Sequence, residues 1–270
     1  MDEYGLAGYN AGAETGRLHR GLGLIEFART KELLTECLPP APAVVYDIGG
    51  AYGEYAFWLA EMGYEVHLFD LAEGHIRTAR GHNDEVTAPQ GIAAAEVADA
   101  RHVPRADASA DAVLMLGPLY HLPEKGERAA ALAECRRLLK PGGVLVTAHI
   151  VPWAPLVDNV VHYDEAPRLD DDAIYERLAD TVRTGRHNGR QVGLMYFQRP
   201  EDARREVADA GFEDVTLRGV LGPCWAIRNL GEAWSDTHRR EAILRVVRLL
   251  DREESLMGFS THYITISHKG

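Results

Sequence analysis

The sequence has few cysteines, no long apolar run and little positive charge. Its three cysteines, Cys37, Cys135 and Cys224, lie far apart and form no Cys-x-x-Cys pair. This spacing argues against a disulfide framework and a cysteine-rich metal site, so we expect buried, reduced side chains. No run of 18 apolar residues is present and the first twenty residues lack an apolar signal core. We therefore expect no membrane span and a cytoplasmic protein.

The charge balance narrows the range of partners. The 270 residues contain 29 Lys and Arg against 41 Asp and Glu, a net charge of −12. Nucleic acids and anionic membrane surfaces require a basic surface, so neither is an expected partner. Because 46% of the residues are hydrophobic, the chain can bury a sizeable core. Together these features predict a soluble globular protein.

Strands and helices alternate through the first half of the chain. Apolar runs predict strands at residues 43–48, 65–70, 91–98, 111–116 and 144–150. Between them lie predicted helices at 54–62, 72–80 and 127–139. Short links between such elements imply right-handed crossovers and parallel strands. The pattern predicts an α/β fold with a Rossmann-like, doubly wound, mostly parallel sheet and helices on both faces.

Outside residues 41–150, which we take as the core, the alternation changes. Residues 1–40 are predicted to be helical, with one helix over 11–37. Residues 151–196 contain several prolines, aromatic residues and a helix near 174–184, which indicates an inserted cap. Residues 197–270 are expected to complete the core with a helix at 201–211 and strands at 213–220 and 259–268. A helical insertion at 221–257 interrupts them, and its long helix near 236–252 could serve a homodimer.

The most informative segment is a glycine-rich loop after the first strand. It reads Asp47-Ile48-Gly49-Gly50-Ala51-Tyr52-Gly53. Glycines allow a sharp turn and a close approach of the backbone to a ligand, and doubly wound sheets bind ligands at this edge. The dinucleotide pattern G-x-G-x-x-G does not fit this spacing. The pattern D-x-G-x-G-x-G fits, except that Ala51 replaces the middle glycine.

On this motif the chain resembles the class I S-adenosylmethionine-dependent methyltransferases, and in particular bacterial small-molecule methyltransferases. The resemblance is strongest over residues 43–150. It implies S-adenosyl-L-methionine as the cofactor and a lid formed by residues 1–40, with Tyr9, Glu14 and Arg17 over the site. A forked guanidinium suits the methionine carboxylate, so Arg17 is the expected partner of that group; a solvated helix face is the alternative.

Further cofactor residues follow the strand ends. Asp70 could accept both ribose hydroxyls, or could simply cap the next helix. The resemblance implies adenine contacts from Leu71, Asp99 and Ala100; a solvated loop acid is the alternative for Asp99. The string Gly117-Pro118-Leu119-Tyr120-His121-Leu122 is typical of the same subgroup, although Gly-Pro is also ordinary turn chemistry. The expected cofactor residues are Tyr9, Arg17, Asp47, Gly49, Gly50, Gly53, Asp70, Leu71, Asp99, Ala100, Leu116 and Gly117.

Candidates for catalysis and acceptor binding are less well defined. Methyl transfer needs a base only when the acceptor keeps a proton, and His121 and His149 are the best placed bases. Other candidates are His187, His262, Asp164, Glu165 and Tyr120. An apolar, aromatic or cationic acceptor is expected to contact Tyr120, Trp153, Tyr196, Phe197 and Trp225. Hydrogen-bonded structural histidines and ordinary core aromatics are the alternatives.

The sequence therefore predicts methyl transfer to an oxygen, nitrogen or carbon of a small molecule, with a role in biosynthesis. Two other functions stay open: an NAD-linked oxidoreductase, and a non-catalytic protein that binds a nucleoside cofactor. No metal is expected, because the acids Asp170, Asp171 and Asp172 fit the start of a helix.

Overall fold

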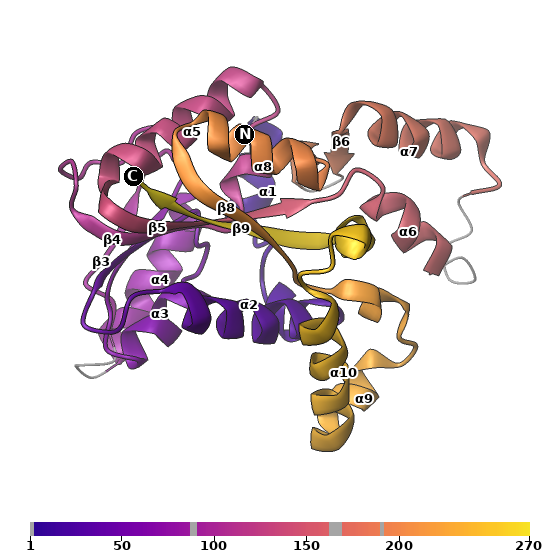
Figure 1. Ribbon diagram of the computed structural model, residues 1–270, viewed down its shortest axis with the longest axis horizontal. Coiled ribbons are helices and arrows are strands. Elements are labelled where there is room, and N and C mark those ends of the chain that lie inside the picture. The colour runs from indigo at the N-terminus through magenta and orange to yellow at the C-terminus, as the bar shows by residue number, and fades with distance from the viewer. Residues whose placement is uncertain (1–2, 87–90, 162–168, 190–191) are drawn as a thin grey trace.

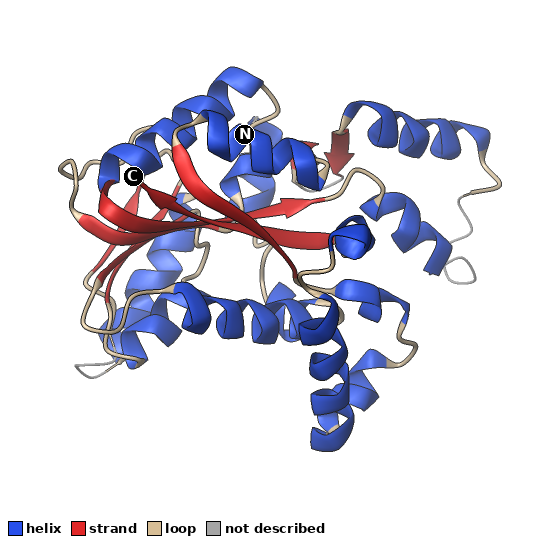
Figure 2. Ribbon diagram, in the orientation of Figure 1, coloured by secondary structure: helices blue, strands red, loops and turns tan. Residues whose placement is uncertain are grey.

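A seven-stranded sheet forms the centre of the molecule (Figures 1 and 2). The computed structural model describes residues 3–86, 91–161, 169–189 and 192–270. The strand order is β3-β2-β1-β4-β5-β9-β8, and β9 runs antiparallel to the other six strands of this sheet. The strands are β1 (Val44–Ile48), β2 (Glu65–Asp70), β3 (Ala94–Val97), β4 (Ala110–Met115), β5 (Leu139–Ile150), β8 (Phe212–Gly219) and β9 (His262–Lys269). The predicted Rossmann-like α/β fold is confirmed.

Helices cover both faces of the sheet (Figure 2). Adjacent side chains of a strand point to opposite faces, and Val113 and Leu114 of β4 accordingly enter two different hydrophobic clusters. One cluster joins the sheet to α2 (Gly23–Cys37), α3 (Glu54–Glu61) and α4 (Glu73–Glu85). The other joins it to α5 (Lys125–Leu138) and α8 (Pro200–Asp209). Burial on both faces explains why the central strands read as continuous apolar runs.

The N-terminal segment differs from the single helix predicted over residues 11–37. Helix α1 covers Glu3–Asn10, a 3-10 turn covers Arg17–His19, and α2 begins only at Gly23. Gly12, Gly16 and Gly21 adopt positive φ angles of 96°, 65° and 52°. Left-handed residues interrupt helical hydrogen bonding, so the chain turns repeatedly before α2. The segment folds over the carboxyl ends of the strands instead of forming one rod.

The region after β5 contains more structure than the one helix predicted there. Helix α6 (Ala154–Val161) precedes α7 (Asp172–Thr184), and a small hairpin of β6 (Arg186–Gly189) and β7 (Gly193–Tyr196) follows. The Asp171 side chain accepts hydrogen bonds from the backbone N–H groups of Ala173 and Ile174, which caps α7. The acid run therefore starts a helix, as predicted. The division of the chain into lid, core, cap and insertion stays a prediction.

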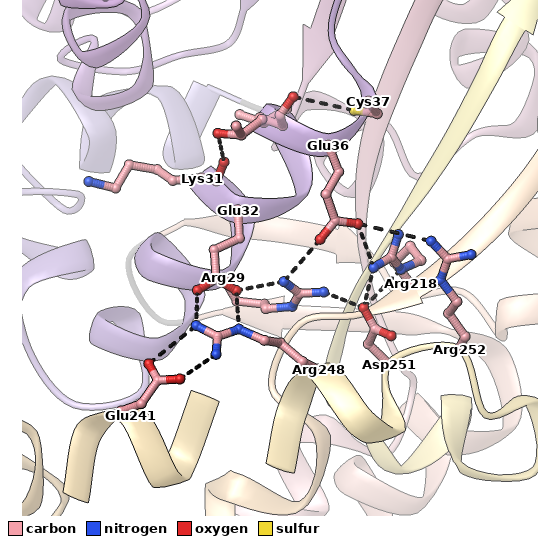
Figure 3. Close-up of polar contacts among 12 residues, drawn as sticks. Arg29, Lys31, Glu32, Glu36, Cys37, Arg218, Glu241, Arg248, Asp251 and Arg252 are labelled. Atoms are coloured by element: carbon pink, nitrogen blue, oxygen red, sulfur yellow. Dashed lines mark hydrogen bonds and ion pairs between the residues drawn. The ribbon is translucent and has the colours of Figure 1, made fainter. Parts of the chain in front are cut away.

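The second insertion projects away from the sheet (Figure 1). It holds α9 (Leu230–Ser235) and α10 (Thr237–Leu250) between two 3-10 turns. A buried ion network fastens it to α2 (Figure 3). The guanidinium groups of Arg29 and Arg218 both bind the carboxylate of Asp251, with Arg218 Nη2 2.5 Å from Asp251 Oδ2. Only 1%, 7% and 3% of these three residues is exposed, so the network holds α10 against the core.

Candidate functional site

A cavity opens beyond the carboxyl ends of β1, β2 and β4. The strand order reverses between β1 and β4, which is where doubly wound sheets bind their ligands. The cavity measures about 1120 Å³ including its open mouth. Five segments line it: residues 9–18, 47–55, 70–75, 98–101 and 116–122. Clefts of this kind, at this edge of a doubly wound sheet, are typical sites for small molecules and cofactors.

Most of the residues expected to bind a cofactor come together at this cavity. The lining includes Tyr9, Arg17, Asp47, Gly49, Gly50, Asp70, Leu71, Asp99, Ala100, Leu116 and Gly117. Gly53 does not line the cavity. It is the N-cap residue of α3 and adopts a φ of 86°. The sequence pattern therefore located the site, while the role of each residue stays a prediction.

The glycine loop leaves no room for side chains where it faces the cavity wall. A Cβ atom on Gly49 would lie 2.3 Å from Cγ of Pro118, and Gly49 has a φ of 74°. A Cβ atom on Gly50 would lie 2.3 Å from Oδ2 of Asp47. Ala51 adopts a φ of 51°, the left-handed conformation that glycine would tolerate better. The loop thus keeps a left-handed turn at position 51 despite the alanine.

Asp47 is a buried carboxyl group below this loop. Only 1% of the residue is exposed, and neither side-chain oxygen has a hydrogen-bond partner among the described residues. Burial, and then the charge of Asp70, raises the pKa of Asp47 to about 7. A cation in the cavity would favour the ionised form. The Asp47 carboxyl group, without a hydrogen-bond partner in the described part of the chain, fits a positively charged cofactor. The absence of side chains on Gly49 and Gly50 lets such a cofactor approach the loop closely.

Asp70 ends β2 and holds the loop through its carboxylate. Oδ2 accepts the backbone N–H of Ala51 at 2.9 Å, and Oδ1 accepts that of Ala72 at 2.8 Å. His75 Nδ1 lies 3.1 Å from Oδ1. Asp70 does not cap α4, because the N-cap residue is Ala72, whose side chain makes no capping hydrogen bond. The Asp70 carboxylate lines the cavity, and contact with the ribose stays a prediction.

Asp99 and Arg17 both have strong partners that the sequence did not indicate. Arg101 donates to both carboxylate oxygens of Asp99, at 2.9 and 2.6 Å, and these bonds lower the pKa of Asp99. Arg17 places its Nη1 and Nη2 2.7 and 2.9 Å from the two carboxylate oxygens of Glu26. Its Nε donates to Glu14 at 2.7 Å. The fork expected to bind a methionine carboxylate is therefore held by two glutamates.

Arg17 and Glu26 join the N-terminal segment to α2. Burial raises the pKa of Glu26, but the neighbouring Arg17 outweighs it and brings that pKa below its usual range. His262 Nδ1 lies 3.4 Å from the same carboxylate. This ion pair holds the turns at residues 11–22 to α2, with Arg17 at the wall of the cavity.

Tyr9 and His121 meet across the cavity wall. Tyr9 Oη lies 2.8 Å from His121 Nε2, and the two rings meet edge to face at 5.2 Å. Tyr120 lies beside them, with ring centroids 4.9 Å apart for Tyr120 and His121. His121 is thus at the cavity, as expected for a base, and its ring partner comes from α1.

His149 lies elsewhere, inside the protein. Its Nε2 is 2.6 Å from Thr147 Oγ1, its Nδ1 is 3.2 Å from Gln198 Oε1, and its ring stacks on Tyr263. Burial lowers the pKa of His149 to about 4, so the ring is neutral at pH 7. This geometry agrees with the alternative of a hydrogen-bonded structural histidine.

Four of the five residues expected at the acceptor do not line the cavity; only Tyr120 does. The indoles of Trp153 and Trp225 donate to the backbone carbonyls of Gly258 and Phe259. Phe197 stacks on His187, and Tyr196 lies under the guanidinium of Arg128 at 4.0 Å. These aromatic residues hold the insertions in place. The base candidates Asp164 and Glu165 lie outside the described residues.

The sequence reasoning missed several cavity residues. They are Leu18, Tyr52, Glu54, Tyr55, His75, Arg101, Pro118 and Leu122. Pro118 and Leu122 belong to the string already singled out, and Tyr52 belongs to the glycine loop. His75 stands five residues after Asp70, and only the first turn of α4 brings it back to that acid. A polar side chain in the first turn of the helix after a predicted ribose acid is the signal that could have found it.

Among the described residues, no three His, Cys, Asp or Glu side chains are grouped as a metal site would require. Nor does any helix in the described ranges have the length and apolarity needed to cross a membrane.

Comparisons with known proteins address the class of the protein. A family model described as a methyltransferase domain matches residues 46–147. A ubiquinone/menaquinone biosynthesis C-methyltransferase, UbiE, of Acidiphilium cryptum is 29% identical over 74% of this chain and 78% of its own length. Seven further curated relatives are aligned over 40% to 64% of their own lengths.

Solved structures with the same fold include two methyltransferases. One is a possible histamine N-methyltransferase of Thermotoga maritima, with a TM-score of 0.60, 16% identity and complete coverage of both chains. The other is phosphoethanolamine N-methyltransferase 2 of Haemonchus contortus, solved with S-adenosylhomocysteine. It has a TM-score of 0.58 and 15% identity, and the match covers 90% of this chain and 52% of that one. At these identities the likeness concerns the fold.

The fold, the glycine cradle and the family match together define an S-adenosylmethionine-dependent enzyme. The chain is a class I S-adenosylmethionine-dependent methyltransferase, with its methyltransferase domain at residues 46–147. The cofactor and the class predicted from the loop are thereby confirmed. The comparisons support neither an NAD-linked oxidoreductase nor a non-catalytic binding protein.

Proposed function

We propose that this enzyme methylates a small molecule whose attacking atom carries a proton, and that Tyr9 and His121 remove that proton. The observation that carries the proposal is the 2.8 Å contact between Tyr9 Oη and His121 Nε2 at the cavity wall. An atom that keeps its proton is a weak nucleophile, so a base at this position serves the reaction.

S-adenosylmethionine, when bound, would supply a methyl group on a positively charged sulfur, activated for in-line transfer to the acceptor. The residues of the chain hold the reactants for this step and exclude water. Gly49 and Gly50 let the cofactor approach the backbone, Asp47 supplies negative charge below the loop, and Asp70 takes the ribose. Leu71, Asp99 and Ala100 are proposed to lie along the adenine.

The proton of the acceptor is proposed to leave through Tyr9 and His121. As the bond to the methyl group forms, the acceptor's proton passes to Tyr9 Oη and the phenol proton passes to His121 Nε2. This requires the tautomer of His121 in which Nε2 is unprotonated. Burial raises the pKa of the Tyr9 phenol well above its usual value, so a lasting phenolate is unfavourable and the two transfers are expected to be concerted.

The side chains that line the cavity indicate which kind of acceptor it could bind. Tyr9, Tyr52, Tyr55 and Tyr120 contribute the aromatic surface of the cavity. Ring faces and edges favour a planar aromatic molecule or a cation. A relative named as a C-methyltransferase, a structure named as an N-methyltransferase and one described as a possible N-methyltransferase support a carbon or nitrogen acceptor. We propose an aromatic acceptor with an ionisable O–H, N–H or C–H group.

Labelled S-adenosylmethionine and a panel of phenols, hydroquinones and aromatic amines would test the proposal. Incorporation of label into an aromatic compound, lost in Tyr9→Phe and in His121→Ala while cofactor binding persists, is the expected result. Turnover that survives both substitutions, or turnover confined to acceptors without a removable proton, would rule it out.

Three finer predictions are proposals of the same kind: a role in biosynthesis, a cytoplasmic location and a homodimer. The last finds support in α10, where Val246 and Leu249 are 43% and 80% exposed. Light scattering on the purified protein, with Leu249→Glu for comparison, would test it. A monomer at working concentration would exclude the dimer.

A further inference from the structure

His75 is a buried histidine on the wall of the cofactor cavity. It lies in the first turn of α4 and is 2% exposed. Its Nδ1 is 3.1 Å from Oδ1 of Asp70, and the ring also lines the cavity. The imidazole ring contacts the carboxylate of Asp70 and the aromatic rings of two tyrosines. The ring of Tyr52 lies 4.6 Å away edge-on, and that of Tyr9 5.7 Å away.

The hydrogen bonds define the tautomer of this ring. Nε2 is buried and has no hydrogen-bond partner among the described residues. A proton on Nε2 would be a buried donor without an acceptor, which is costly. The proton of the neutral ring therefore belongs on Nδ1, where the carboxylate of Asp70 accepts it. His75 is a donor to Asp70, held in place by the rings of Tyr9 and Tyr52.

The hydrogen bonds that Asp70 already accepts determine how many acceptor positions its carboxylate can offer to a ligand. Each carboxylate oxygen can accept about two hydrogen bonds. Oδ1 already accepts two, from the N–H of Ala72 and from His75 Nδ1. Oδ2 accepts one, from the N–H of Ala51. Among the described residues no other donor reaches Asp70, so one acceptor position remains, and it is on Oδ2.

We infer that His75 is a positioning residue for the cofactor ribose, which turns Asp70 so that Oδ2 alone receives one ribose hydroxyl. The inference rests on the proposed placement of the ribose at Asp70. The two hydroxyls are then recognised unequally, whereas a freely exposed carboxylate would accept both. His75 acts through Asp70 and not on the transferred methyl group, so its loss changes cofactor binding.

Calorimetry with S-adenosylhomocysteine tests the positioning role without any need for turnover. His75→Phe keeps a ring but removes the donor, and we expect affinity to fall at least about tenfold. His75→Asn places a side-chain N–H near the position of Nδ1 and is expected to restore affinity to within about threefold of the wild type. His82→Phe, an exposed position on the same helix, is the matched control. An unchanged affinity in His75→Phe, or Asn as weak as Phe, would overturn the inference.

Analogues that lack one hydroxyl test the unequal recognition. With the wild type, one of the 2′-deoxy and 3′-deoxy forms of S-adenosylhomocysteine should bind at least about tenfold more weakly than the other. In His75→Phe that ratio should move towards one, because Oδ1 regains an acceptor position. Equal losses in the wild type would refute the inference. Tight binding of S-adenosylhomocysteine by a protein that transfers no methyl group would contradict the proposed acceptor chemistry. It would leave the inference about His75 unaffected.

Discussion

The phenol oxygen of Tyr9 lies 2.8 Å from Nε2 of His121, although 112 residues separate the two in the chain. Helix α1 brings the tyrosine to the cavity, and the 3-10 turn Pro118–His121 after β4 brings the histidine. The first prediction follows from this contact. Tyr9→Phe should lower kcat roughly 100-fold or more for an acceptor that must lose a proton.

The dissociation constant for S-adenosylhomocysteine should change little in Tyr9→Phe, since the ring remains. Steady-state kinetics and calorimetry measure the two effects separately. Tyr175→Phe on α7, 49% exposed, is the control and should keep full activity. A kcat equal to that of the wild type would exclude Tyr9 from the proton route.

Removing the Asp70 carboxylate should weaken cofactor binding. Asp70→Ala leaves the N–H groups of Ala51 and Ala72 and a ribose hydroxyl without their acceptor. The expected loss is about 1–3 kcal/mol of binding free energy for S-adenosylmethionine, measured by calorimetry. Asp84→Ala, on the exposed side of α4, should have no effect on binding. An unchanged affinity in Asp70→Ala would remove that acid from the site.

Glycine at position 51 should stabilise the protein. Ala51 has a φ of 51°, and an alanine in this conformation costs about 1–2 kcal/mol that a glycine does not. After the larger backbone entropy of glycine is subtracted, Ala51→Gly should raise the free energy of unfolding by about 0.5–1 kcal/mol. Urea unfolding provides the measurement. Ala130→Gly, at an exposed site inside α5, should lower it by about 1 kcal/mol; equal signs for the two would contradict the strain argument.

Asp47 should make stability depend on pH. Its pKa is about 7 when folded, above the usual value near 3.9 for an unfolded chain. The folded protein therefore holds a proton that the unfolded chain has released, and this contribution, about 4 kcal/mol, is complete below pH 4 and is lost as pH rises through 7.

His149 acts in the opposite direction, because its pKa is lowered to about 4, and stability is lost as pH falls from 6.5. The difference between wild type and Asp47→Asn isolates the first effect. Relative to the wild type, Asp47→Asn should gain stability steadily from pH 4 to pH 7 and no further above it. Urea unfolding at several pH values measures this, and a difference that does not vary with pH would refute the raised pKa.

The ion network around Asp251 should be sensitive to a single change. Asp251→Asn leaves Arg29 and Arg218 buried with one carboxylate fewer, and such a loss typically costs about 3–5 kcal/mol. Chemical unfolding would show the loss. Glu241→Gln, at the exposed end of the network, should change stability little. Equal effects of the two substitutions would mean that burial does not govern this network.

Much of the fold and the position of the site could be predicted from the chain alone. The apolar runs of the central strands and the glycine loop after β1 are local patterns. Chain connectivity then places the carboxyl ends of parallel strands at one edge. Asp47 and Asp70 lie at the carboxyl ends of β1 and β2, and Leu116 follows β4. Their meeting at one cavity could therefore be expected without any knowledge of side-chain packing.

Other features escaped prediction because they depend on contacts between distant segments. Arg17 was expected either to pair with the methionine carboxylate or to lie on a solvated helix face. In the structure its guanidinium binds the carboxylate of Glu26. Trp153 and Trp225 suggested an acceptor pocket, yet both pack against the segment just before β9. Aromatic composition does not show which surface a ring will face.

The sequence by itself determined the sheet, the cofactor loop and hence the class of enzyme, because these depend on local periodicity and on strand order. Only the tertiary structure decided which side chains meet at the wall of the cavity. It placed Tyr9 against His121, Arg17 against Glu26, and His75 against Asp70. The first two contacts join α1 and the turns after it to the rest of the chain, and the third needs the first turn of α4. Their geometry is therefore set by how the elements pack, which no local pattern contains.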